Sequence, residues 1–201
     1  MAVLGAMRGA WSRAVLGARA LPFLAAAAAF LAAGPGATAQ SVGVREYQVK
    51  AVFLYNFAEF VEWPPGAFDD SHSPLIIGIL GEDPFGAYLD EAVRDATVNS
   101  RPMAIRRFRR VEDVTACHIL FIGLSEPAQL REALSGLKGR SILTVGEADG
   151  FSQLGGMIRF VVENNRIRLR INLDAAKAAG LSISSKLLRP ATIVSMRRVR
   201  P

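Results

Sequence analysis

Ser125 is the residue whose surroundings come nearest to those of a catalytic nucleophile. It lies in the segment GLSEP at 123–127, which resembles the Gly-x-Ser-x-Gly turn of hydrolases but ends in proline. A serine in such a turn needs a histidine base later in the chain, and both histidines, His72 and His118, come earlier. The sequence therefore favours a helix N-cap at Ser125, and no catalytic residue and no enzymatic activity are predicted. An exported hydrolase that uses Ser125 or scattered carboxylates is kept only as a third hypothesis.

Metal and nucleotide chemistry also lack the residues they need. Two histidines and one cysteine without ligand spacing make no zinc site, so neither a metal nor a cofactor is predicted. Three glycines, Gly78, Gly81 and Gly86, surround an expected strand-to-helix turn, where phosphate loops occur. Their spacing matches neither the dinucleotide fingerprint nor the Walker pattern, so a plain turn is the preferred interpretation.

The first 39 residues are typical of a cleaved export signal. They hold three arginines and no acidic residue, and an apolar run follows at 21–33. Ala37 and Ala39 give the small-x-small form of a signal-peptidase site, which predicts cleavage before Gln40. The run is too short to cross a bilayer comfortably, so an uncleaved anchor is the less favoured alternative. Residues 40–201 are expected to form a single periplasmic domain that does not span the membrane.

Basic residues dominate the charge of the chain, whose formal net charge is +6. The densest cluster is Arg106, Arg107, Arg109 and Arg110. An exported protein seldom meets nucleic acid, and only Phe108 offers an interleaved aromatic ring, so nucleic-acid binding is not predicted. The preferred interpretation is a solvated edge strand protected by charge, and the alternative is contact with an acidic partner or with anionic head groups.

Cys117 is the only cysteine, so the chain has no partner for an internal disulfide. A buried small hydrophobic residue at the start of a strand is the preferred interpretation, ahead of a reactive thiol. A disulfide-linked dimer is the remaining alternative. On a strand, Cys117 and His118 would point to opposite faces.

Strands and helices alternate along the mature chain. Helices are expected at 44–63, 84–95, 126–137 and 182–188, with a helical turn at 112–116; Asp83 and Ser125 are the expected caps and Pro64-Pro65 the first terminator. Strands are expected at 75–80, 103–108, 118–122 and 142–145. This alternation predicts an α/β fold, a single-domain, largely parallel sheet flanked by helices. An antiparallel hairpin is expected near the C-terminal part.

The expected hairpin turns at Asn164 and Asn165, because asparagine tolerates the positive φ of a type I′ turn. The turn sets the register and puts six apolar residues on one face: Ile158, Phe160, Val162, Ile167, Leu169 and Ile171. Four arginines share the other face: Arg159, Arg166, Arg168 and Arg170. Asn172 then caps a short helix at 173–179, and Gly180 follows it as a left-handed residue.

Two apolar rows lie along the first expected helix, and together they are wider than one buried stripe requires. A helix packed between the sheet and another element is the preferred interpretation. The sharper hypothesis is a partner or dimer face. Its predicted residues are Phe57, Phe60 and Trp63 from this region, with Arg159, Arg168 and Arg170 from the hairpin, because aromatic residues and arginine favour interface hot spots. We expect Phe60→Ala to weaken partner binding with little change in stability.

The carboxyl ends of the parallel strands offer an alternative function. Small ligands bind beyond these ends in parallel sheets. Here the ends carry polar residues: Gly81, Glu82 and Asp83, then Gly123 and Ser125, then 147–149. They allow a periplasmic small-ligand-binding sensor or carrier that acts on another receptor.

Four segments together resemble the YfiR family of exported bacterial proteins. They are VKAVFLYNFAEFVEWP (49–64), PLIIGILGEDPFG (74–86), CHILFIG (117–123) and the run at 142–188 that contains GGMI, NL and SSKLL. They cover most of the mature chain in the family's order. The chain is thereby identified as a member of that family.

The resemblance implies a non-enzymatic periplasmic regulator. Its implied partner is the periplasmic domain of an inner-membrane diguanylate cyclase of the YfiN type. Repression of that cyclase would limit cyclic-di-GMP signalling and biofilm formation. Homodimers are associated with the family, so a homodimer is a further expectation. Some members carry disulfides, but Cys117 has no partner here, so redox control is not carried over.

Overall fold

The computed structural model describes residues 36–194. Among these residues, 41–194 belong to one compact unit. The predicted export signal lies outside the described residues except for 36–39, so its cleavage stays a prediction. Within residues 36–194, no helix combines the length and the apolarity needed to cross a bilayer.

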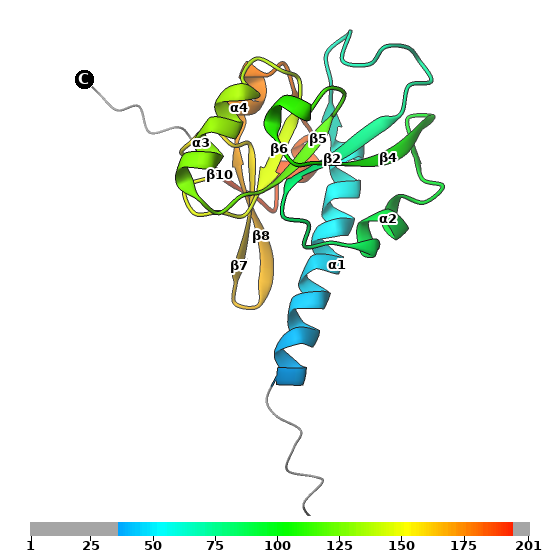
Figure 1. Cartoon of the computed structure of the whole chain (residues 1–201). Helices are drawn as coiled ribbons and strands as arrows, with labels where there is room; N and C mark the ends of the chain where they lie inside the picture. The colour runs from blue at the N-terminus through cyan, green and yellow to red at the C-terminus, as the bar shows by residue number, and fades with distance from the viewer. Residues whose placement is uncertain (1–35, 195–201) are drawn as a thin grey trace, which may run out of the picture. The chain divides into compact units, whose positions relative to one another are not determined.

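An eight-stranded sheet, in the order β10-β8-β7-β6-β5-β2-β4-β3, is the centre of the unit (Figure 1). Its strands are β2 (Leu75–Gly81), β3 (Thr97–Val98), β4 (Arg101–Phe108), β5 (Ile119–Gly123), β6 (Leu143–Gly146), β7 (Ile158–Glu163), β8 (Arg166–Asn172) and β10 (Thr192–Val194). Neighbours from β4 to β7 pair in parallel, and β8 pairs antiparallel with β7. The predicted α/β fold, with a mostly parallel sheet and a C-terminal hairpin, is confirmed.

Helices cover both faces of this sheet. They are α1 (Gly36–Phe60), α2 (Ala87–Val93), α3 (Pro127–Gly136), α4 (Leu173–Ala178) and α5 (Ser185–Leu188), with a 3-10 turn η1 (Val111–Asp113). Leu54 and Phe57 of α1 join one hydrophobic cluster, while Leu130 of α3 joins the other. β2 contributes Ile77 to the first and Leu80 to the second, as the alternation of side chains along a doubly buried strand requires.

The hairpin matches its prediction residue by residue. Asn164 and Asn165 have φ values of 51° and 58°, as a type I′ turn requires. Val162 lies opposite Ile167, and Arg159 lies opposite Arg170, in the predicted register. The Asn172 side chain accepts a hydrogen bond from the Ala175 amide at 3.0 Å and so caps α4. Gly180 has the expected left-handed φ of 75°.

Several element boundaries differ from the prediction for non-local reasons. α1 ends at Phe60, not at Trp63, because Val61 and Glu62 form β1 (Val61–Glu62), which pairs antiparallel with β9 (Ser182–Ile183). The predicted last helix at 182–188 is therefore wrong in its first part. β10, which the sequence analysis missed, adds to the sheet beside β8.

Two predicted helix caps are also wrong. Asp83 accepts hydrogen bonds from the amides of Phe85 and Gly86 at 2.9 and 3.1 Å, which closes a turn before α2. The helix itself starts four residues after Asp83, with Gly86 as its N-cap. α3 is preceded by Glu126, whose side chain makes no capping bond, and Ser125 lies one residue further away.

Candidate functional site

One exposed apolar surface is shared by α1 and the hairpin, and we call it the α1–hairpin surface. It consists of Val49, Val52 and Phe53 of α1 with Val162 and Ile167 of the hairpin. Val49, Val52 and Val162 are 48%, 51% and 48% exposed. Together with neighbouring side chains, four of the five line a groove of about 460 Å³. Contiguous exposed apolar side chains of this kind mark interaction sites more often than single ones do.

Aromatic packing holds the two elements of this surface together. The Phe160 ring of β7 stacks on Phe57 with centroids 6.0 Å apart and contacts Phe53 at the same distance. Both Phe57 and Phe160 are fully buried. The apolar face of the hairpin thus continues past its buried part to Val162, whose side chain faces solvent beside α1.

The predicted partner-binding aromatics lie nearer the core than a contact surface requires. Phe57 has an exposed fraction of 0% and packs against the sheet. Phe60 and Trp63 are half-buried against the same cluster. The Trp63 ring nitrogen donates a hydrogen bond to the His118 carbonyl at 3.3 Å. The preferred interpretation, a packed helix, therefore describes Phe57, while Phe60 and Trp63 keep some exposed surface.

The predicted arginines lie on the other face of the hairpin, so the structure does not join all six residues in one patch. Arg159 is 14% exposed and pairs with Asp149. Arg170 pairs with Glu163 at 3.0 Å, which relieves its repulsion from Arg159 across the strands. Arg168 is exposed. Of the three, Arg168 is the most available to a partner.

A buried lysine, which the sequence analysis missed, joins α1 to the carboxyl end of β6. Lys50 is only 2% exposed and pairs with Glu46 at 2.5 Å and with Glu147. The Tyr47 hydroxyl donates to Glu147 at 3.0 Å, and the Lys50 ammonium lies 4.4 Å from the Tyr47 ring centre. The i,i+4 spacing of Glu46 and Lys50, one turn before Phe53, was the available signal.

Residues predicted at the carboxyl ends of the strands do meet in one small pocket. Glu82, Ser125 and Glu147 line a cavity of about 180 Å³ together with Tyr47 and Phe121. Burial, followed by the nearby Glu147 carboxylate, raises the pKa of Tyr47 well above its usual range. Tyr47 therefore remains a neutral hydrogen-bond donor in this cavity.

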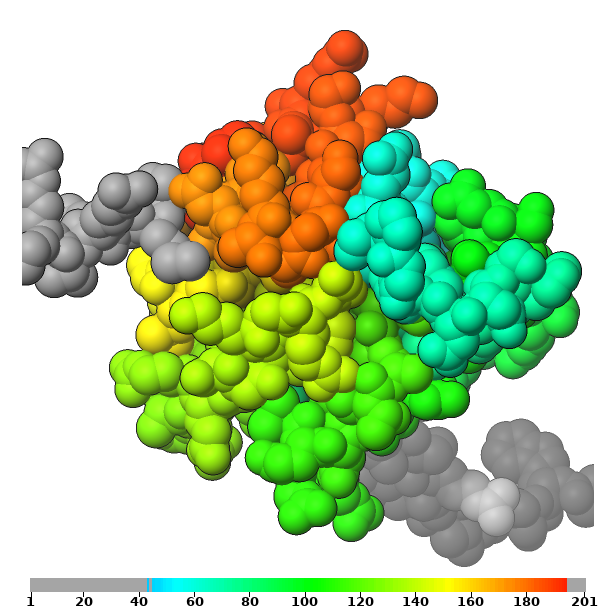
Figure 2. Space-filling view, turned by 90° about the horizontal axis from the view of Figure 1, so that it is seen from above, coloured from blue at the N-terminus to red at the C-terminus, as the bar shows by residue number. Residues whose placement is uncertain are grey.

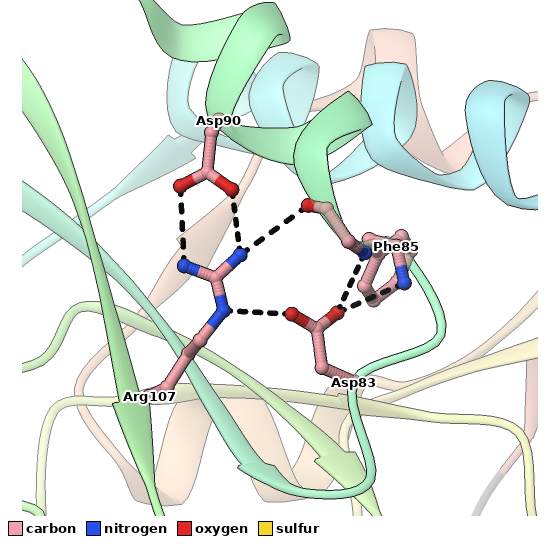
Figure 3. A network of polar contacts seen from close by, with 5 residues as sticks. Asp83, Phe85, Asp90 and Arg107 are labelled. Carbon is pink, nitrogen blue, oxygen red and sulfur yellow. Dashed lines mark hydrogen bonds and ion pairs between the residues drawn. The ribbon is translucent and has the colours of Figure 1, made fainter.

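Asp83, predicted at the same edge, instead belongs to an ion-pair network on the β4 side (Figure 3). The Arg107 guanidinium donates to Asp83 and to Asp90 of α2, each at 2.7 Å. It also donates to the Gly86 carbonyl at 3.3 Å. Hydrogen bonds from Arg107 lower the pKa of Asp90. This network attaches α2 to β4 and explains one arginine of the basic cluster.

Metal-ligand side chains and the single thiol complete the description of this part of the chain. In the part of the chain that the structure describes, no three His, Cys, Asp or Glu side chains gather as a metal site. Cys117 is buried, and burial raises the pKa of its thiol to about 12. The thiol is therefore protonated at neutral pH, which matches a packing role.

Comparison with known proteins places the chain in a family. A family model described as YfiR/HmsC-like matches residues 47–192, from α1 to β10. No curated protein matches the chain. The matched range contains both the hairpin and the Lys50 network. Because the match covers well over half of the sequence, this chain belongs to the YfiR/HmsC-like family.

Proposed function

We propose that this protein is an exported periplasmic regulator without enzymatic activity. It binds the periplasmic domain of an inner-membrane diguanylate cyclase of the YfiN type and represses it, which limits cyclic-di-GMP signalling and biofilm formation. Family membership supports the regulatory class. The observation that carries the binding role is the α1–hairpin surface, with three valines about half exposed.

The composition of this surface suits a protein partner. Its apolar centre is bordered by Arg45, Glu46 and Arg166, which also line the groove. An apolar centre with a polar rim is the usual anatomy of an interface. Arg168 on the opposite face of the hairpin lies outside this groove, so we expect its contribution to be smaller.

Titration calorimetry of the purified mature protein against the periplasmic domain of the host cyclase tests the proposal. Saturable binding near micromolar, about −8 kcal/mol, is expected. Val49→Asp places a charge among the residues that line the groove and should weaken binding at least about tenfold. Because Val49 is 48% exposed, the effect of this substitution on the free energy of unfolding should stay within about 0.5 kcal/mol.

Ile193→Asp is the matched control, because Ile193 on β10 is also 48% exposed but lies outside the groove. Equal weakening by both variants would argue against the α1–hairpin surface. Absence of binding by the wild-type protein, with no co-elution, would argue against this partner. That result would favour another receptor, or a homodimer formed through the same surface.

A small-ligand sensor is the second candidate, and the pocket at the carboxyl ends of the strands favours it. Glu82, Ser125 and Glu147 converge there from three strand ends. Ligand control of partner binding would make the two functions compatible. A thermal-shift screen tests this candidate, and a stabilising ligand whose effect disappears in Glu82→Gln would support it.

A further inference from the structure

A hollow in the surface lies at the amino ends of the parallel strands. It has a volume of about 550 Å³. The loop at 64–74, the segment 115–118 before β5 and the segment 140–142 before β6 form its walls. Figure 2 looks onto this face, where these segments, coloured cyan, green and yellow-green, lie next to one another. A hollow of this size suits a small organic molecule.

Two arginines from distant parts of the chain line this pocket. Arg106 lies on β4, and its side chain points to the opposite face from Arg107 because neighbours alternate along a strand. Arg140 precedes β6 and donates a hydrogen bond to the Thr115 carbonyl at 2.6 Å. The positive charges of both guanidinium groups act on Cys117, whose pKa they lower against the larger effect of burial.

Neither arginine is neutralised by a close carboxylate. Among the described residues, Arg107, Arg110, Arg159 and Arg170 each form an ion pair within 4.0 Å, whereas Arg106 and Arg140 form none. One carboxylate, Asp69, is found among the lining residues. The pocket thus holds two cationic groups against one anionic group.

Two aromatic rings, Phe68 and His118, form an uncharged part of the pocket wall. His118 accepts a hydrogen bond from the Ile76 amide at Nδ1, at 3.0 Å, so its Nε2 carries the proton and donates to the Ala67 carbonyl at 3.1 Å. This pair of bonds fixes a neutral ring. Phe68 stacks on that ring with centroids 4.1 Å apart. The wall offers apolar and π surface but adds no charge.

We infer that this pocket binds a small organic anion that carries one carboxylate or phosphate group on an apolar body. Arg106 and Arg140 would hold the anionic group, since guanidinium groups bind carboxylate and phosphate oxygens through paired hydrogen bonds. The apolar body would lie along the prolines of the 64–74 loop and the half-buried ring of Phe68. This site is at the opposite end of the strands from the Glu82 pocket, and its function does not depend on the cyclase.

Phenyl phosphate is the probe, titrated into the purified protein while amide resonances are followed by NMR. Saturable shifts are expected for residues 115–118 and 140–142. Arg106→Gln should weaken the apparent affinity about tenfold or more, since a charge-assisted contact of this kind is commonly worth a factor of ten. Arg106→Lys keeps the charge but loses the planar guanidinium group, so its affinity should lie between those of the wild type and Arg106→Gln. Arg106 makes no described side-chain bond, so the variants should fold.

Arg109→Gln is the control. It removes the same charge three residues after Arg106, and Arg109 lines a different pocket. Equal weakening by Arg106→Gln and Arg109→Gln would overturn the inference, and so would the absence of saturable shifts together with the absence of Arg106-dependent binding to the vesicles described next. Vesicles containing phosphatidylglycerol form a second arm. Arg106-dependent binding to these vesicles but not to phenyl phosphate would keep the anion site and identify a lipid head group as the source. Binding to phenyl phosphate alone would identify a free metabolite.

Discussion

The two ends of the parallel strands differ in whether their buried or pocket-lining charged side chains are paired. At the carboxyl ends, Lys50 is held by Glu46 and Glu147, and the cavity that remains is about 180 Å³. At the amino ends, Arg106 and Arg140 border a pocket of about 550 Å³, and neither is paired among the described residues. Parallel sheets usually bind ligands at the carboxyl ends. Here the chain's own ion pairs occupy much of that position, and the amino ends hold the larger hollow with free charge.

The carboxyl end should be the more sensitive to a loss of charge. Lys50→Met keeps most of the side-chain volume but leaves Glu46 and Glu147 without their buried partner. We expect a loss of about 3 kcal/mol in the free energy of unfolding, at the lower limit for a broken buried pair because the two carboxylates are 28% and 31% exposed. Urea unfolding measures it.

The control for this variant is Lys138→Met, at an exposed lysine, which should change stability by less than about 0.5 kcal/mol. Adding Glu147→Gln to Lys50→Met should recover part of the loss. Equal stability of wild type and Lys50→Met would show that the carboxyl-end network is not what holds α1.

Glycine substitutions should give the next largest difference in stability between the two ends, because only one of the two glycines is in close contact with another strand's backbone. The Glu82 amide donates to the Gly123 carbonyl at 3.1 Å, and a Cβ on Gly123 would overlap the carbonyl oxygen of Glu82. We expect Gly123→Ala to cost about 2 kcal/mol by forcing β2 and β5 apart. Near the amino ends, Gly139 has open space around it and a φ of 80°, so Gly139→Ala should cost only about 1 kcal/mol, from conformation alone. Thermal unfolding of the pair would test this, and a reversed order would contradict it.

Two neighbouring arginines on β4 allow a comparison within one strand, because Arg107 forms ion pairs and Arg106 forms none among the described residues. Arg107→Gln removes the links to Asp83 and Asp90 and should cost at most about 1 kcal/mol, since Arg107 is 43% exposed. The loss should shrink at high salt, where exposed charges are screened. Arg106→Gln should leave stability unchanged and alter only anion binding. Urea unfolding at low and high salt distinguishes the two, and equal losses would remove the contrast.

Protonation of His118, near the amino ends of the strands, should give the smallest of these effects on the free energy of unfolding. Burial lowers the pKa of His118 below its ordinary 6.5, and the Ile76 amide bond to Nδ1 requires an unprotonated nitrogen. The unfolded chain therefore binds the proton at a higher pH than the folded protein. Stability from this group is complete above about pH 6.5 and falls as the pH drops toward the lowered pKa of the folded state.

Urea unfolding at pH 7.5 and at pH 5.5 checks whether stability falls in acid as predicted. His118→Asn keeps an acceptor for the Ile76 amide but has no titrating ring, so its stability should fall less in acid than that of the wild type. His72→Asn is the control, because His72 is exposed and should leave the wild-type pH dependence intact. An unchanged pH dependence in His118→Asn would place the acid sensitivity elsewhere.

The candidate sites were predictable only in part. Glu82, Ser125 and Glu147 were placed at one edge because parallel strands bring their carboxyl ends together. Lys50 was missed, and the basic cluster was interpreted as one surface although β4 sends Arg106 and Arg107 to opposite faces. Val49 and Val52 fall outside the two apolar rows that were noticed in the first helix. Their exposure depends on where the hairpin stops covering that helix.

The hairpin shows what the sequence determined by itself. Its signals are local: they are the two asparagines, the alternating apolar residues and the Asn172 cap. The strand register, the turn type and the start of the helix could therefore be predicted from the sequence. The end of α1 shows what only the tertiary structure decided. Val61 leaves the helix to pair with Ile183, about 120 residues further along the chain. Partners that distant leave no local pattern. The burial of Phe57 likewise depends on which segments the fold brings together. The same holds for Arg106 and Arg140, which have no carboxylate partner among the described residues.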